Sequence, residues 1–288
     1  MSASILQSLI DGLLMGGVYA LAALGISLIF GVMKITNFAH GALITAGMYV
    51  TYECCTILGV TPYIALPLVL IIMFILGFVI QKIFLNPIMG VGGHNQLLLT
   101  QGLAIVIENL ILVLFTANYK SVSVPGFETA IKVGIVTINK PKLVAFLFAV
   151  LISLGIYFVL NKTDLGRAIR ATSVQPEGAT LMGIVVPKIN AIAFGIGIVC
   201  AGVAGALLTP TQYISPTSGN SYSLKCFVIA VFGGLGNIWG AVMAGLIIGI
   251  VESFAALFLG GSWSEMVIYL IFILTLIIKP TGLLGKKG

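Results

Sequence analysis

The sequence predicts an all-α integral membrane protein, a polytopic bundle of eight or nine transmembrane helices. Only 8% of its 288 residues are charged and 59% are hydrophobic, whereas a soluble domain is about one quarter charged. The apolar residues form runs close to the roughly 20 residues that a helix needs to cross a bilayer, not the alternating segments of a β-barrel. The composition therefore excludes a soluble enzyme, a disordered chain and a nucleic-acid-binding protein, and it makes the membrane the expected surroundings.

Eight full spans follow one another along the chain. They cover residues 5–33, 37–59, 62–85, 96–117, 141–160, 188–208, 237–259 and 264–279. A shorter run near 223–236 lies between two glycine-rich turns and predicts a broken or half helix, a re-entrant piece or a short ninth span. The first run is expected to stay as a span, since it lacks the basic region and cleavage site of a signal peptide. These runs predict a single transmembrane domain over residues 1–288.

Basic residues near the ends of the runs predict the orientation. The connection 161–188 and the C-terminal tail contain seven of the 14 basic residues: Lys162, Arg167, Arg170, Lys188, Lys279, Lys286 and Lys287. We expect both segments on the cytoplasmic side, with the linker 118–140 and the N-terminus outside. Three lysines in the linker weaken this assignment.

The connection 161–187 predicts two short helices. Thr163 or Asp164 can cap the first, while Pro176 suits the first position of the second, at about 175–182, and Gly183 can end it. A helix of two turns is unstable alone in water. The apolar Leu181 at its end therefore indicates contact with a partner surface; the alternative is a loop packed only on its own bundle.

Polar groups inside the runs are candidates for a translocation path, because they are costly in lipid. The set consists of Asn37, His40, Gln101, Glu108, Asn109, Asn237 and Glu252. Asn237 follows three glycines within four residues, a sequence typical of irregular backbone at membrane depth. The alternative role for the whole set is hydrogen bonding between helices, and for His40 this alternative is favoured.

Signatures of catalysis and cofactor binding are lacking in the sequence. The four cysteines form no CxxC pair, the two histidines are far apart, and no phosphate-binding loop or nucleophile–base pair occurs. We therefore expect no catalytic, metal or cofactor site, so any ATP would be bound by another chain. An ion-coupled secondary transporter is a weaker alternative, because the few scattered intramembrane charges make no carboxylate relay.

Seven blocks along the chain resemble the permease subunits of branched-chain amino-acid ABC importers of the LivH type. They lie at Gly17–Gly25, Asn37–Gly41, Thr163–Ala171, Pro176–Ile184, Ala201–Gly205, Gly233–Ala241 and Lys279–Gly282. The blocks occur in the family's order over nearly the whole sequence, which makes the resemblance specific.

The resemblance implies a multi-pass permease of the bacterial inner membrane that imports leucine, isoleucine and valine. It implies a second homologous permease subunit, two separate ABC ATPase subunits and an external amino-acid-binding protein as partners. The short helix near 175–182 resembles the coupling helix that docks on the ATPase. The expected ATPase-coupling residues are Arg167, Arg170, Glu177, Leu181 and Met182. The same scaffold importing urea, short amides or sugars is the alternative, since fold does not fix substrate.

Overall fold

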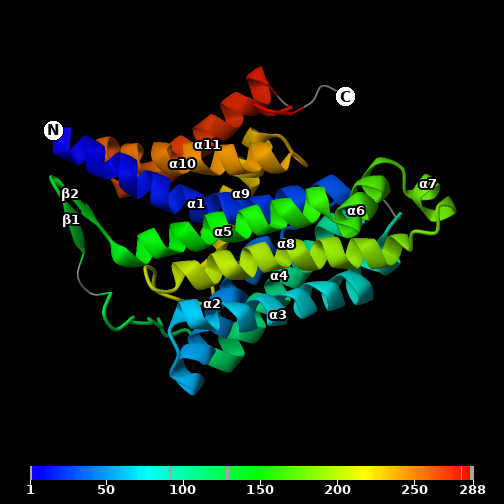
Figure 1. Cartoon of the computed structure of the whole chain (residues 1–288), viewed down its shortest axis with the longest axis horizontal. Coiled ribbons are helices and arrows are strands. Elements are labelled where there is room, and N and C mark those ends of the chain that lie inside the picture. The colour runs from blue at the N-terminus through cyan, green and yellow to red at the C-terminus, as the bar shows by residue number, and fades with distance from the viewer. Residues whose placement is uncertain (1, 91–92, 128–129, 280, 286–288) are drawn as a thin grey trace.

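The chain forms an elongated helical bundle (Figure 1). The structure, a computed structural model, describes residues 2–90, 93–127, 130–279 and 281–285. Pro280, Lys286 and Lys287, which the sequence analysis used, lie outside this part of the chain. The α-helices are α1 Ser2–Met33, α2 His40–Leu58, α3 Pro62–Ile80, α4 Gly93–Phe115, α5 Lys140–Lys162, α6 Asp164–Val174, α7 Pro176–Leu181, α8 Val186–Leu208, α9 Gly219–Gly233, α10 Ile238–Leu259 and α11 Gly261–Ile278.

Eight of these helices in the described residues are long and apolar enough to cross a membrane. They are α1, α2, α3, α4, α5, α8, α10 and α11, which confirms the predicted polytopic all-α architecture. The predicted bounds of the spans differ from those of the helices in the structure mainly at the helix ends. The third run, 62–85, is not one regular helix, because α3 passes into a π-helix, Gln81–Leu85, and then a 3₁₀ turn, Asn86–Ile88. Pro87 at the start of that turn has no N–H with which to continue the helix.

The ninth run is a shorter helix, α9, that begins and ends earlier than predicted. Its 15 residues are about 22 Å long at 1.5 Å per residue, less than the roughly 30 Å of a hydrocarbon core. Its first residue, Gly219, packs against Gly41 at the beginning of α2. A Cβ on Gly41 would lie 2.6 Å from the Cβ of Ser223. The two helix starts can therefore lie side by side only because glycine occupies both contact points.

Helices α1 and α8 form the centre of the bundle, and both are mostly buried. Helix α1 packs on α10, α8, α5 and α9, while α8 also packs on α3 and α2. Small residues allow these close approaches: a Cβ on Gly12 would lie 2.7 Å from the carbonyl oxygen of Gly249. By contrast, α4 and α5 lie at the periphery, and few of their residues are buried.

The two ends of the bundle are different. At one end, the start of α1 meets a short hairpin of strands β1 Ile131–Val133 and β2 Val136–Ile138, which the sequence analysis did not predict. Gln7 fastens this hairpin, since its Nε2 donates to the carbonyl of Thr137 at 2.8 Å. At the other end lie α6 and α7 (Figure 1). Residues 281–285 lie at this second end, because the N–H of Leu283 donates to the carbonyl of Phe232 at 2.7 Å. We call it the coupling end, after the coupling helix that the sequence analysis expects there.

Candidate functional site

The connection at the coupling end folds as two helices, α6 and α7, as predicted. The hydroxyl of Thr163, not the carboxylate of Asp164, caps α6 by accepting a hydrogen bond from the N–H of Gly166 at 3.3 Å. Asp164 instead forms an exposed ion pair with Arg167 one turn later. The guanidinium of Arg170 donates to the carbonyl of Leu160, the last turn of α5. The cap and this bond hold α6 against the end of α5.

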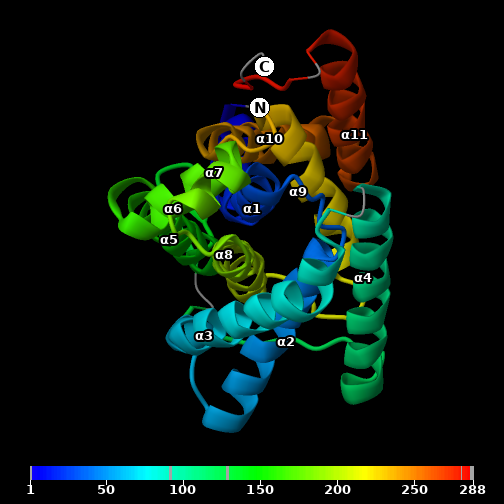
Figure 2. The same ribbon diagram turned by 90° about the vertical axis from the view of Figure 1, so that its right-hand side faces the viewer.

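Helix α7 is one and a half turns long and is held at its inner side by Ala179, which is buried. Gly183 ends it with a φ of +81°, where a side chain would be strained. Its N–H donates to the carbonyl of Thr180 at 2.9 Å. Glu177 lies in the first turn, where a carboxylate interacts favourably with the helix dipole. The arrangement brings the five predicted coupling residues to one end of the molecule, as Figure 2 shows for α6 and α7.

Four apolar side chains at this end are exposed. Val174, Leu181 and Met182 are 85%, 88% and 82% exposed, and Val185 is also exposed. We call these four residues the apolar knob. The sequence analysis identified Leu181 and Met182 but not the two valines, which precede and follow α7. Val174 is the last residue of α6 and Val185 directly precedes α8, so their spacing gave no helical pattern. Exposed apolar side chains outside the spans are typical of a protein-binding surface.

The polar residues at the start of α2 form a first group inside the bundle. The Oδ1 of Asn37 accepts a hydrogen bond from the N–H of Ala39 at 3.0 Å. The Nε2 of His40 lies 2.9 Å from the carbonyl oxygen of Ala22 in α1. Both side chains are buried, and the Asn37 Nδ2 and His40 Nδ1 atoms have no partner within the described residues. His40 thus links two helices, the role that the sequence analysis favoured for it.

Glu252 belongs to a separate group that joins α9, α10 and α11. Its Oε1 lies 2.7 Å from the Nζ of Lys225, and the Oε1 of Glu265 lies 3.2 Å from the same nitrogen. The Lys225 side chain is 8% exposed, and its nitrogen lies 5.9 Å from the ring centre of Tyr19. We call Lys225, Glu252 and Glu265 the ion cluster. A buried lysine in contact with two carboxylates fastens α9, the short helix, to its two neighbours.

The remaining predicted path residues lie elsewhere. Asn237 caps α10, since its Oδ1 accepts from the N–H of Gly240 at 3.1 Å, while its Nδ2 donates to the carbonyl of Leu284 at 2.7 Å. On α4, Gln101 and Asn109 are exposed and Glu108 is half-buried. The seven predicted path residues therefore do not form one site, but lie in four separate places.

Two further features were missed by the sequence analysis. One is the pairing of Lys225 with Glu252: the two charges lie in separate apolar runs, and their opposite signs were the available signal for pairing. Glu265 gave no such signal, because it lies near the start of the last run. On α9, Asn220 and Ser221 are exposed polar residues. Figure 2 shows α9 on the same side of the molecule as α4, so polar groups of both helices lie on this side.

Comparison with known proteins identifies the family. The family model described as "Branched-chain amino acid transport system / permease component" matches residues 8–276. The branched-chain amino-acid transport permease BraD of Pseudomonas aeruginosa is 31% identical over 98% of this chain and 96% of its own length. LivH of Escherichia coli K12 is 29% identical over the same shares. A probable LivH protein of Methanocaldococcus jannaschii is 30% identical over 92% of this chain and 88% of its own length.

No solved structure matches the chain significantly. The family match extends from the first turns of α1 nearly to the end of α11, and the described residues contain eight helices of spanning length. The chain therefore belongs to the family of branched-chain amino-acid transport permease components and is a multi-pass membrane protein.

Proposed function

We propose that the chain is the permease subunit of an ATP-driven importer that moves leucine, isoleucine and valine across the inner membrane. The observation that carries this proposal is the match to branched-chain permeases along nearly the whole chain. The sequence contains no phosphate-binding loop, so separate ATPase subunits hydrolyse the ATP. An external binding protein delivers the amino acid to the outer end. The whole chain, residues 1–288, acts as one transmembrane domain.

The coupling end binds the ATPase through α7 and the apolar knob. Leu181 and Met182 are exposed beyond the end of α5, where contact with a soluble partner would bury them. Glu177 and Arg167 are exposed polar residues at the rim of this surface. Arg170 fixes the position of α6 through its bond to Leu160. Burial of two large apolar side chains gives on the order of 3–6 kcal/mol, enough to make α7 the main contact.

The polar side formed by α4 and α9 faces a second, homologous permease subunit. Gln101, Glu108 and Asn109 lie on a peripheral helix, and exposing them to lipid would be costly. Among the described residues, Glu108 has no hydrogen-bond or ion-pair partner, whereas Asn109 donates only to the carbonyl of Ile105 in its own helix. A path between two permease copies would hydrate these groups. This arrangement gives the polar residues of α4 a role in translocation.

The test of coupling is co-purification of the ATPase subunits with the permease in detergent. We expect the double variant Leu181→Asp/Met182→Asp to release the ATPase and to abolish leucine uptake, because two carboxylates in an apolar interface remain unpaired. Val133→Asp is the matched control, since Val133 is an exposed apolar residue in the hairpin at the opposite end. Retained ATPase and unchanged uptake in the double variant would refute the proposed coupling.

The substrate is tested by competition in cells or proteoliposomes that contain the permease, its ATPases and its binding protein. We expect excess isoleucine and valine to reduce uptake of labelled leucine, while urea, acetamide and ribose leave it unchanged. Transport of labelled urea or ribose without leucine transport would instead support the alternative substrate on the same scaffold.

A further inference from the structure

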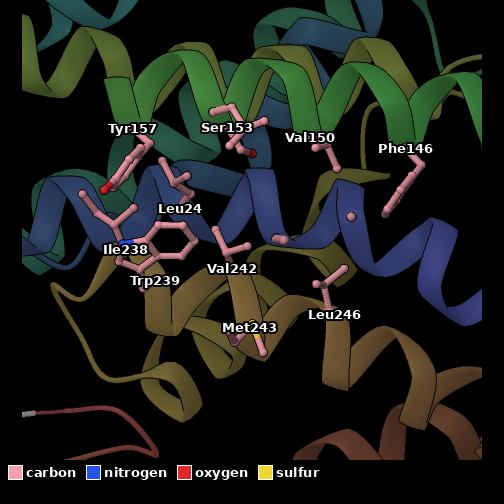
Figure 3. Close-up of a pocket in the computed structure, with 13 residues that line it drawn as sticks. Leu24, Phe146, Val150, Ser153, Tyr157, Ile238, Trp239, Val242, Met243 and Leu246 are labelled. Atoms are coloured by element: carbon pink, nitrogen blue, oxygen red, sulfur yellow. The ribbon is translucent and has the colours of Figure 1, made fainter. Parts of the chain in front are cut away.

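A groove runs along α1 between α5 and α10, and it is lined almost entirely by apolar side chains (Figure 3). Its volume is about 290 Å³, near the lower limit for ligand pockets of about 300–1,000 Å³. Each of the three helices forms one wall of the groove, with side chains such as Leu24 of α1, Val150 of α5 and Val242 of α10. Such a groove accepts an apolar ligand or lipid.

A second, smaller pocket continues the groove toward the coupling end. Its volume is about 110 Å³, and Ile238 lines both spaces. Ser27, Asn161 and Arg170 give this pocket a polar lining. The hydroxyl of Ser27 is fully buried and has no hydrogen-bond partner among the described residues. A buried hydroxyl without a partner beside an arginine is a ready donor for an anionic oxygen.

The combined length of the two spaces matches one leaflet of a membrane. Their linings follow α1 from Gly17 to Gly31, 14 residues that extend about 21 Å. One leaflet with its headgroups contributes about half of the roughly 40–45 Å of a whole bilayer. Tyr157 and Trp239, with ring centres 4.9 Å apart, lie at the end of the groove opposite Phe146 (Figure 3). Tyrosine and tryptophan favour the depth of the lipid headgroups, so the polar pocket lies at headgroup depth.

The charge at this depth is positive. Arg167 is compensated by Asp164, but Arg170 donates only to a carbonyl oxygen and lines the polar pocket. Lys162 at the end of α5 has no acidic partner in the described part of the chain. A guanidinium has donors left over after one bond to a carbonyl, and it binds phosphate well. The expected ligand is therefore an anion at this end of the groove.

We propose that the groove binds a phospholipid with an anionic headgroup. One acyl chain lies along α1 between α5 and α10, and the phosphate contacts Arg170 and Ser27. The lining favours a lipid over a helix of a second permease copy, because Arg170 and the unpartnered hydroxyl of Ser27 match an anionic oxygen at one end of an otherwise apolar groove. A single flexible acyl chain can follow the apolar lining of this groove. The proposal does not depend on the transported substrate.

The test measures phosphatidylglycerol bound to the full chain, purified in mild detergent, by native mass spectrometry and lipid extraction. Ser153→Phe fills the groove, and Leu151→Phe on the exposed face of the same helix is its control. Arg170→Gln removes the charge, and Lys188→Gln removes another basic charge at the coupling end as its control. We expect each test variant to lower bound phosphatidylglycerol about tenfold, the loss typical of one charge-assisted contact or of an excluded chain. The controls should retain it.

Three outcomes would overturn the proposal. The first is unchanged phosphatidylglycerol in Ser153→Phe and Arg170→Gln. The second is equal binding of phosphatidylcholine, whose headgroup is zwitterionic. The third is an efficient disulfide between two copies of a Ser153→Cys variant, which would place a second permease over the groove. If Ser153→Phe does not elute as a single species in size exclusion, Ser27→Ala tests the headgroup contact in its place, and unchanged binding there counts against the proposal.

Discussion

Removal of the Lys225 charge is the most informative perturbation of this fold. In the ion cluster, Lys225 is 8% exposed and touches Glu252 at 2.7 Å and Glu265 at 3.2 Å, while the two carboxylates are 17% and 44% exposed. Lys225→Met keeps the length of the side chain but leaves both carboxylates without a cation. Breaking a buried ion pair by removing one partner costs about 3–5 kcal/mol, so we expect this variant to lose that much stability.

The two carboxylate variants should be milder and unequal. Glu252→Gln leaves Lys225 paired with Glu265 and removes one charged hydrogen bond, a loss of about 1.5–3 kcal/mol. Glu265→Gln affects a half-exposed group, for which an ion pair is worth about 0–1 kcal/mol. The expected order of destabilisation is therefore Lys225→Met, then Glu252→Gln, then Glu265→Gln. Only Lys225→Met leaves charges without a partner, and of the two carboxylates Glu252 is the more buried, so its ion pair is the more costly to lose.

Thermal unfolding of the detergent-purified protein with a thiol-reactive dye measures this order. Cys54, Cys200 and Cys226 are free and buried, so they react when the bundle opens, while the half-buried Cys55 sets the background. We expect Lys225→Met to lower the unfolding midpoint by on the order of 10 °C. Equal midpoints for the three variants, or an unchanged midpoint for Lys225→Met, would refute the conclusion that the cluster fastens α9.

Two other predictions concern packing and the coupling end. Gly12→Ala places a Cβ 2.7 Å from the carbonyl oxygen of Gly249, and such overpacking costs about 1–3 kcal/mol, so we expect a lower unfolding midpoint. The control is Gly155→Ala, whose Cβ meets nothing within 4 Å and should leave the unfolding midpoint unchanged or higher. Asn237→Asp retains the cap of α10 but loses the donor to Leu284, so we expect faster proteolysis of a C-terminal tag with little change in stability, and equal proteolysis would contradict the role of this bond.

Local patterns determined the features that depend on near neighbours in the sequence. The spans were found because each apolar run is itself long enough to cross the hydrocarbon core. The α6–α7 connection was predicted from Thr163, Pro176 and Gly183, since caps and helix ends depend on residues within one turn. The short ninth run was predicted to be a broken or half helix, a re-entrant piece or a short span, because glycine-rich turns lie on both sides of it. The hairpin in the linker 118–140 was missed, because its short strands lack a strong alternating pattern.

Contacts between distant residues could not be found in this way. Lys225 and Glu265 are 40 residues apart in sequence, and only the packing of α9 against α10 and α11 brings them within 3.2 Å. For the same reason, the sequence could not show that the seven predicted path residues lie in four separate places. A membrane sequence identifies which groups are costly in lipid, but it does not tell which partner satisfies each group.

The sequence by itself determined that this is a polytopic helical membrane protein of the permease family with a short helix in the connection between two spans. Low charge and long apolar runs predict a transmembrane helical bundle, and the seven blocks indicate its family. The tertiary structure decided which helices are central, how Gly41 and Gly219 let two helix starts meet, and that Arg170 faces a pocket beside α1. The physical reason is that the hydrophobic effect and backbone hydrogen bonding place helices in the membrane one run at a time, whereas helix packing depends on shapes and charges that come together only after folding.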